Sequence, residues 1–364
     1  MAGSAGRATV PRVTKNRGTP RKRPTAARER TRADHWQRVL RVLVHLDARL
    51  DTDLSLARLA KLAHLSPHHF QRVFAAVAGE SCKQHVQRLR LERAARELCA
   101  TDRDIAEIAA DAAYVDVPTF YRAFRARFGA APATFRDRCK AKRGPSPRPA
   151  AVQRWQVVTG DDGQLRSVPH PADSAPADCG PAARIVMLAK LRIAFVRRTG
   201  PVTARTVAAD FARLVAFAAR RGPVPEPFLV RLHHDDPTIT PKPLRRVDHG
   251  ITIGPRRRGE GDIGIRTIGD REMLAATCAG SGAVPAVRRW LENDAVVAAS
   301  ASRRFGPVLE VLLDHDSDDD ERALRDVLVE IAPRPAGHPW YWRRRPVPRE
   351  TTNPPTDRTR RNRS

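Results

Sequence analysis

The stretch Ser66-Pro-His-His-Phe-Gln-Arg-Val-Phe74, followed by Gly79, decides the fold of the first part of this chain because it occurs twice. Its second copy is Val117-Pro-Thr-Phe-Tyr-Arg-Ala-Phe124, followed by Gly129. A short apolar-periodic segment precedes each copy, over 56–60 and 105–109. A short helix, a turn and a second helix that ends at a glycine form a helix-turn-helix, so the sequence predicts this unit twice.

Apolar spacing separates a buried face from an exposed face on the second helix of each unit. The predicted buried stripes are Phe70, Val73, Phe74 and Val77 in the first unit and Phe120, Phe124 and Phe128 in the second. Exposed residues near the start of a recognition helix contact base edges. Here they are His68, His69, Gln71 and Arg72 in the first unit and Val117, Thr119, Tyr121, Arg122 and Arg125 in the second. Arginine can bind guanine, and glutamine adenine, through two hydrogen bonds, so these residues are the predicted DNA-binding site.

The segments around the two units are also expected to be helical, because residues 33–140 contain few prolines and glycines. A long helix over 81–99 joins the units, with an inward face of Leu91, Ala94, Ala95 and Leu98. Further helices are expected over 35–50 and from Pro132 onward. A rigid helix between two recognition helices would let them enter successive turns of the major groove, roughly 34 Å apart.

The two units and their spacing resemble the AraC/XylS transcription regulators. The pattern is Leu59-Ala60…Ser66-x-x-x-Phe70-Gln71-Arg72-x-Phe74…Gly79, then Ile105-x-x-Ile108-Ala109…Tyr114…Phe120-x-Arg122-x-Phe124…Phe128-Gly129-x-x-Pro132-x-x-Phe135-Arg136. The resemblance implies seven helices that bind double-stranded DNA as one unit, with RNA polymerase as a further partner. Family members often have Gly-Phe in the second turn, where this chain keeps the aromatic ring in Ala113-Tyr114.

A second domain, over 184–333, is expected after a Pro-rich linker over 141–183. β-rich runs alternate there with two helical runs, which predicts an α+β domain. The runs form two strand-helix-strand-strand halves, with helices over 204–220 and 285–298 and strands over 185–196, 228–232, 250–253, 272–278, 308–313 and 327–331. Two such halves predict an antiparallel sheet with a groove on the pseudo-two-fold axis.

This arrangement resembles the GyrI-like effector-binding domain, through Asp236-Pro237-x-x-Thr240-Pro241, Arg246-x-Asp248 and Pro307-Val-Leu-Glu310-Val-Leu-Leu313. The resemblance implies a groove that binds a small cationic or amphipathic effector and includes an acidic side chain. Glu310 is the candidate effector-binding residue, because a carboxylate on a strand of Val and Leu is costly to bury without a partner. The alternative is a Glu310 that faces solvent or pairs with an arginine.

Composition excludes several other classes of protein. The 364 residues carry a formal net charge of +26, much of it at the two ends, 1–32 and 334–364, which are predicted to be disordered basic tails. No apolar run is long enough to span a membrane. Five cysteines without a Cys-x-x-Cys pair argue against a disulfide framework or a zinc ribbon. Common hydrolase, zinc-protease and phosphate-loop motifs are absent, and the polar runs 233–236 and 314–316 are expected to be solvated.

Together these features predict a multidomain bacterial protein, cytoplasmic and nucleoid-associated. An all-α tandem helix-turn-helix domain over 33–140 precedes an α+β GyrI-like domain over 184–333. The predicted function is sequence-specific regulation of transcription in response to a small effector, with no cofactor, no metal and no catalytic activity. Two alternatives stay open: a nucleoid or gyrase-interacting protein that binds DNA without sequence preference, and a hydrolase tethered to a DNA-binding domain.

Overall fold

The computed structural model describes residues 26–50, 52, 54–142, 155–159, 165–169, 183–188, 190–220, 227–254, 257–292, 306–313 and 324–331. Most of the two predicted tails and of the predicted linker lie outside these residues. Residues 26–32 were assigned to the N-terminal tail by the sequence, but in the structure they form the first turns of helix α1.

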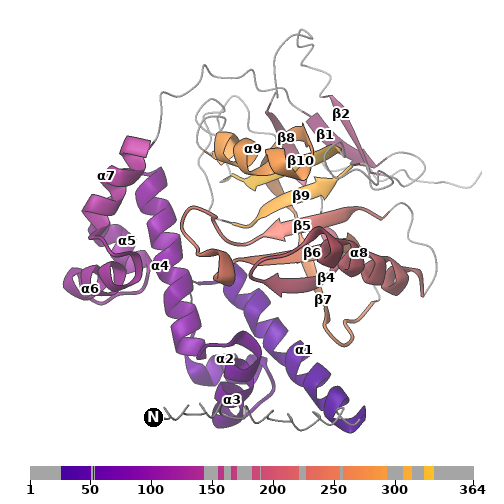
Figure 1. Ribbon diagram of the computed structural model, residues 1–364, viewed down its shortest axis with the longest axis horizontal. Coiled ribbons are helices and arrows are strands. Elements are labelled where there is room, and N and C mark those ends of the chain that lie inside the picture. Colours follow the sequence, from indigo (N-terminus) through magenta and orange to yellow (C-terminus); the bar gives the residue numbers. More distant parts are fainter. Residues whose placement is uncertain are drawn as a thin grey trace, which may run out of the picture.

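Seven helices make up the described part of the chain from 26 to 142, as the sequence predicts (Figure 1). They are α1 (Ala26–Ala48), α2 (Leu56–Leu62), α3 (Pro67–Ala78), α4 (Cys82–Ala100), α5 (Ile105–Asp111), α6 (Val117–Phe128) and α7 (Pro132–Lys142). Helices α2–α3 and α5–α6 are the two helix-turn-helix units. Gly79 and Gly129 end α3 and α6 with φ angles of 77° and 69°, a left-handed conformation that glycine adopts without strain.

Each unit has its own small core, and α4 contributes to both. Phe70 and Phe74 of α3 are fully buried against α1, α2 and the start of α4. Phe120 and Phe124 of α6 are fully buried against the second half of α4, including Leu98. The predicted stripes are therefore confirmed at these positions, whereas Val77 and Phe128 are half-buried.

An eight-stranded sheet forms the second domain. Its strands are β3 (Arg184–Leu188), β4 (Leu191–Thr199), β5 (Leu229–His233), β6 (Arg246–Thr252), β7 (Ile263–Ile268), β8 (Arg271–Ala279), β9 (Val308–Leu312) and β10 (Leu324–Glu330). They lie in the order β3-β8-β10-β9-β5-β6-β4-β7, and every neighbouring pair is antiparallel. With α8 (Ala204–Ala219) and α9 (Val284–Trp290), the predicted halves are confirmed as β4-α8-β5-β6 and β8-α9-β9-β10. The sequence did not predict β7, or the hairpin partner β2 (Leu165–Pro169) of β1 (Trp155–Thr159).

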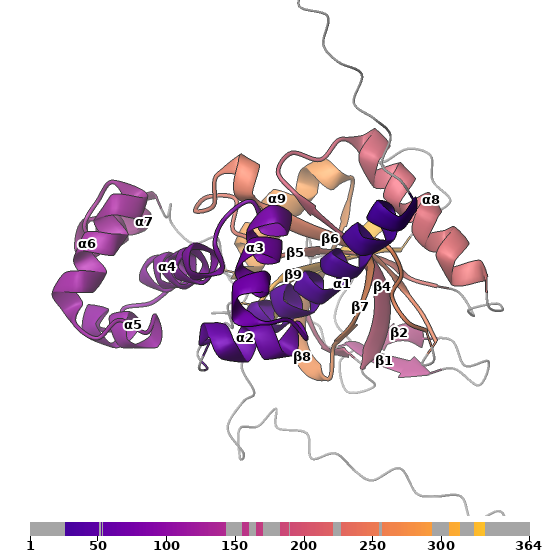
Figure 2. The ribbon, with the colours of Figure 1, turned by 90° about the horizontal axis from the view of Figure 1, so that it is seen from below.

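The two faces of this sheet have different partners. Helices α8 and α9 pack on one face, α8 through Leu214 and α9 through Val284. Helix α1 packs on the opposite face, where Leu40 joins a core with Phe195 and Val230 (Figure 2). Helix α1 therefore belongs to two cores at once, that of the first helix-turn-helix unit and that of the sheet.

A disulfide joins Cys99 of α4 to Cys139 of α7. The odd number of cysteines and their spacing argued against disulfides, and this expectation is wrong because α4 and α7 pack side by side in the folded domain. Within the described residues, Cys82 and Cys278 are free. None of the described helices has the length and apolar character that a membrane span requires.

Candidate DNA interface and the contacts behind it

Helix α3 presents its first turns to solvent. Ser66 is the N-cap, and its hydroxyl accepts a hydrogen bond from the backbone N–H of His69. His68, Gln71 and Arg72 are exposed, as the sequence predicts. His69 is half-buried, because its ring packs edge-on against His35 of α1 with the ring centroids 5.3 Å apart. The exposed set on α3 is therefore His68, Gln71 and Arg72.

Helix α6 repeats this arrangement with a stronger cap. The Asp116 carboxylate accepts hydrogen bonds from the Thr119 backbone N–H at 2.7 Å and from the Thr119 hydroxyl at 3.0 Å. Arg122 Nη2 donates to the same hydroxyl at 3.1 Å. Arg122 and Arg125 are exposed, whereas Val117, Thr119 and Tyr121 are half-buried. Both arginines are thus available to an acceptor outside the protein.

A chain of ion pairs holds the two units in a fixed relation. Arg88 of α4 pairs with Glu80, which follows α3, at 2.7 Å and with Glu92 at 3.3 Å. Glu92 also pairs with Arg127 of α6 at 2.8 Å, so the chain runs from the end of α3 through α4 to α6. Burial alone would raise the pKa of Glu80, but hydrogen bonds from His85 and Arg88 lower it to about 2. Glu80 is therefore ionised at neutral pH.

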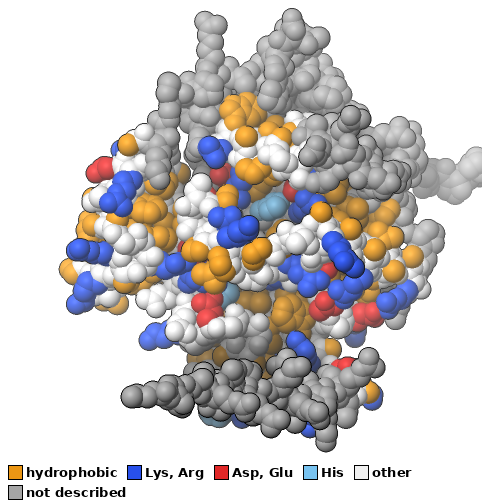
Figure 3. All heavy atoms as spheres, in the orientation of Figure 1, with side chains coloured by type: hydrophobic (Ala, Val, Ile, Leu, Met, Phe, Trp, Pro, Cys, Tyr) orange, Lys and Arg blue, Asp and Glu red, His pale blue; other side chains and the backbone are white. Residues whose placement is uncertain are grey.

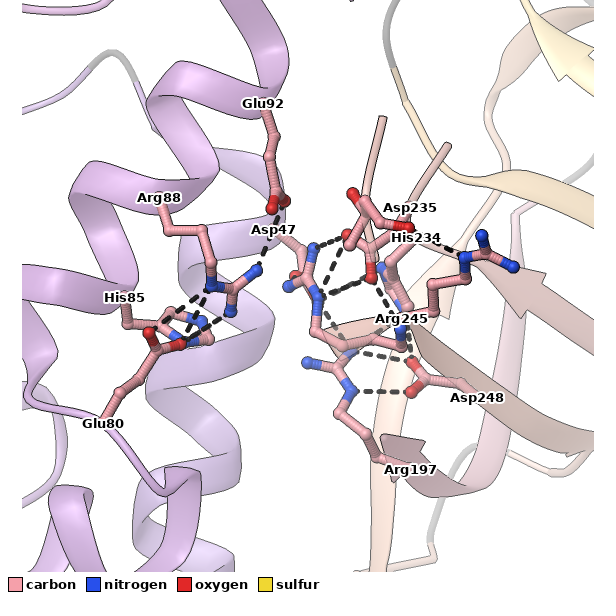
Figure 4. Close-up of polar contacts among 12 residues, drawn as sticks. Asp47, Glu80, His85, Arg88, Glu92, Arg197, His234, Asp235, Arg245 and Asp248 are labelled. Atoms are coloured by element: carbon pink, nitrogen blue, oxygen red, sulfur yellow. Dashed lines mark hydrogen bonds and ion pairs between the residues drawn. The ribbon is translucent and has the colours of Figure 1, made fainter. Parts of the chain in front are cut away.

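A second ionic cluster lies beside α4, between α1 and the sheet (Figure 4). Asp47, near the end of α1, pairs with Arg197 of β4 at 2.6 Å and with Arg246 of β6 at 2.8 Å. Asp248 of β6 pairs with Arg197 at 2.7 Å and with Arg266 of β7 at 3.0 Å. All five side chains are at least nine-tenths buried. This cluster ties α1, and with it the helical domain, to the sheet.

Two loop residues complete the cluster. His234 Nε2 lies 2.8 Å from Asp248 Oδ2, and Asp235 pairs with Arg246 at 2.7 Å. The sequence predicts that the run 233–236 is solvated, and this is wrong for His234 and Asp235, which are buried beside Asp47 of α1 and Arg246 of β6. Burial lowers the pKa of His234, and Asp47 and Asp248 only partly oppose it. With a neutral His234, the charges of Asp47, Asp235 and Asp248 balance those of the three arginines.

Apolar and backbone contacts extend the junction along α1. Gln37 Nε2 donates to the carbonyl oxygen of Ile263 at 2.8 Å, and Trp36 Nε1 donates to that of Asp262 at 3.3 Å. Gly264 of β7 has no room for a side chain, because a Cβ there would overlap Leu40 of α1 and the Phe195 ring. From the β5–β6 loop, Ile239 packs against the core of the second helix-turn-helix unit. The sheet domain therefore contacts both units.

Glu310, the predicted effector-binding residue, lies on the opposite face, between α8 and α9. It is 1% exposed. Its Oε1 accepts hydrogen bonds from Arg325 at 2.7 Å and Arg231 at 3.3 Å, and its Oε2 lies 2.9 Å from His233 Nε2. Burial alone would raise the pKa of Glu310, but these partners lower it to about 2. Of the alternatives that the sequence leaves open for Glu310, the structure shows pairing with arginine, because β5 supplies Arg231 on one side and β10 supplies Arg325 on the other.

The cluster around Asp47 was not predicted from the sequence. One signal was available: Ile193, Phe195 and Arg197 alternate along β4, so Arg197 occupies an inward position. Arg246 and Asp248 lie in the pattern that resembles the GyrI-like domain, which says nothing of their partners. Nothing in the local sequence distinguishes Asp47 from a solvated residue at the end of an amphipathic helix. Within the described residues, no group of histidine, cysteine or acidic side chains could hold a metal ion, and the run 314–316 lies outside them.

Comparison with known proteins points to one family for the helical domain. A family profile described as "Helix-turn-helix domain" matches residues 59–138. The regulatory protein SoxS of Salmonella typhimurium is 34% identical over 104 residues, which cover 29% of this chain and 97% of SoxS. The bifunctional transcriptional activator/DNA repair enzyme AdaA of Bacillus subtilis is 29% identical over 121 residues, covering 33% of this chain and 56% of AdaA. A solved transcriptional regulator with an AraC-type DNA-binding domain, from Chromobacterium violaceum, is 23% identical with a TM-score of 0.28, covering 29% of this chain and 95% of its own.

Proposed function

Because this chain belongs to the AraC-type helix-turn-helix regulators, we propose that it binds double-stranded DNA at a specific sequence and regulates transcription. The observation that carries the proposal is the paired presentation of α3 and α6. Each helix is capped, exposes arginine near its start and is held by α4 through buried cores and the ion pairs of Arg88 and Glu92. Two helices fixed in this way can enter neighbouring major-groove segments together.

In this proposal the two arginines discriminate between bases. Arg72 and Arg122 reach guanine edges, Gln71 reaches adenine, and Arg125 contacts guanine or a phosphate. The net charge of +26 adds affinity for any DNA through phosphate contacts, without sequence information. The two contributions differ in their sensitivity to salt and to base sequence, so experiments can separate them.

We further propose that the sheet domain senses a small effector near Glu310. The support is that α1 is shared between the first helix-turn-helix unit and the sheet, through Leu40 and Asp47. A ligand that changes the packing of the sheet therefore changes contacts made by a DNA-binding helix, provided that it binds the two states with different affinity. On this proposal the protein acts in the cytoplasm, at the nucleoid, with RNA polymerase as a partner.

The test is footprinting on promoter fragments with wild type, Arg72→Ala and Arg122→Ala. Each substitution is expected to weaken binding to the cognate site by about 1–3 kcal/mol, roughly 5- to 150-fold, and to change binding to random DNA much less. Arg205→Ala removes the same charge from an exposed position on α8 and is the matched control. Equal losses on cognate and random DNA would favour the alternative, a protein that binds DNA without sequence preference.

A further inference from the structure

The two halves of the sheet meet at β5 and β9, and this junction is charged. Its register places Arg231 of β5 directly opposite Glu310 of β9. Apolar residues flank the pair on the same face: Leu229 and Leu312 contribute to the core under α8, and Val308 to the core under α9. The charged pair therefore lies between the two apolar cores, next to the one under α8.

Among the side chains around Glu310, Arg231 has the least complete set of hydrogen bonds. Its side chain is 13% exposed, and its contact with Glu310, at 3.3 Å, is the longest of the three that Glu310 makes. Within the described residues, its buried Nε has no hydrogen-bond partner. The guanidinium carbon lies 5.8 Å from the centroid of the Phe211 ring of α8, a contact that provides no acceptor. A buried guanidinium with an unused donor favours an additional acceptor.

His233 makes this position accessible from outside. It lies two residues from Arg231 on β5, so both side chains lie on the face of α8 and α9. Its side chain is 32% exposed, in contrast to the buried Glu310 and Arg325. Figure 3 shows basic side chains, with some acidic ones among them, around the centre of this face. An incoming ligand would therefore meet donors before it met the carboxylate.

We propose that Arg231 and His233 bind the carboxylate or phosphate group of a small acidic effector. The proposal rests on the sensor role proposed above and reverses the charge that the sequence analysis expects of the effector. A ligand cation would have to displace Arg231 or Arg325 from Glu310, leaving a buried guanidinium without its partner. An anion bound by Arg231 and by Nδ1 of His233 leaves the Nε2 contact of His233 with Glu310 in place and adds an acceptor for Arg231.

The position of His233 also gives a route to the DNA-binding helices. The next residues in the chain, His234 and Asp235, make the buried contacts with Asp248 and Arg246. Further along the same loop, Ile239 packs against the second helix-turn-helix unit. A ligand bound by His233 therefore contacts the end of β5, where the β5–β6 loop begins. That loop carries the contacts to the helical domain.

The test compares three probes that share one ring system: naphthoate, naphthyl phosphate and naphthylmethylammonium. At least one of the two acids is expected to raise the melting temperature of the full chain with increasing concentration, and the ammonium compound is not. The acid that raises the melting temperature shows whether the site prefers a carboxylate or a phosphate. Arg231→Gln is expected to lower the affinity about 10- to 100-fold, since it removes a charge-assisted hydrogen bond. Arg205→Gln, at an exposed position of α8, is the matched control and should leave the affinity unchanged.

Two further measurements make the outcome decisive. Arg231→Lys keeps the charge, so partial recovery of affinity would separate a charge effect from misfolding. Titration with inorganic phosphate, followed by the NMR signals of His233, reports on the site even if the naphthyl ring does not fit. A stabilising ammonium compound, or acids and phosphate that leave both readouts unchanged, would overturn the proposal. Footprinting without ligand tests the DNA-binding proposal separately.

Discussion

The substitution Asp47→Asn tests whether the buried ionic cluster holds α1 against the sheet. Asn keeps the shape of the side chain but removes the charge that faces Arg197 at 2.6 Å and Arg246 at 2.8 Å. Although burial alone would raise the pKa of Asp47, these arginines hold it well below its usual range, so the wild-type side chain is charged at neutral pH. The variant leaves three buried arginines against the two carboxylates of Asp235 and Asp248.

The expected cost of Asp47→Asn follows from this imbalance. Breaking a buried ion pair on one side costs about 3–5 kcal/mol, because the partner charge stays buried without compensation. Since a domain is stable by only about 5–15 kcal/mol, the loss is large. Urea unfolding of the full chain at about pH 7.5, followed by circular dichroism, measures it as a lower midpoint.

Asp34→Asn is the matched control on the same helix. Asp34 pairs with Arg38 at 2.7 Å, but its side chain is 54% exposed. An exposed pair of this kind contributes about 0–1 kcal/mol. If Asp47→Asn lowered the free energy of unfolding no more than Asp34→Asn, the cluster would not be what holds α1 to the sheet.

Two other predictions concern the same junction. Gly264→Ala is expected to destabilise the protein by about 1–3 kcal/mol, because the new Cβ overlaps Leu40 and Phe195. Gly282→Ala is the control, because a Cβ there meets no atom within 4 Å. Equal urea midpoints for the two variants would contradict the overlap. For pH, the folded-state pKa of His234 lies below its ordinary value of 6.5, so the unfolded state binds more protons between the two values. The free energy of unfolding should be at its full value above about pH 6.5 and fall as the pH drops below it. In the His234→Gln variant, the urea midpoint should fall less over the same pH range. If the variant showed the same pH dependence as wild type, a neutral buried His234 would be contradicted.

Local sequence was sufficient for the helical domain. Apolar residues three and four apart predicted which faces of α3 and α6 are buried, and Gly79 and Gly129 marked the ends of these helices. The start of α1 was missed, because residues 28–32 are polar or charged and form exposed helical turns without an apolar stripe. Exposure of Arg72 and Arg122 followed from the same periodicity, whereas the half-burial of His69 depends on His35 of another helix.

The strands of the second domain were also predicted largely from local pattern, but their neighbours were not. Strand β7 was missed, although its pairing with β4 forms the edge that α1 covers. The register of β5 with β9 places Arg231 opposite Glu310, far apart in the chain. No local pattern contains that information, since hydrogen bonding between strands decides which side chains become neighbours.

The sequence by itself determined the two helix-turn-helix units, because their signals act within a few residues: periodicity, capping and a glycine at each helix end. The tertiary structure alone decided how the two domains meet. Asp47 looks like any acidic residue at the end of a surface helix until Arg197, Arg246 and Arg266 are brought to it from three strands. The physical reason is that a charge can be buried only where opposite charges converge, and that convergence depends on the fold as a whole.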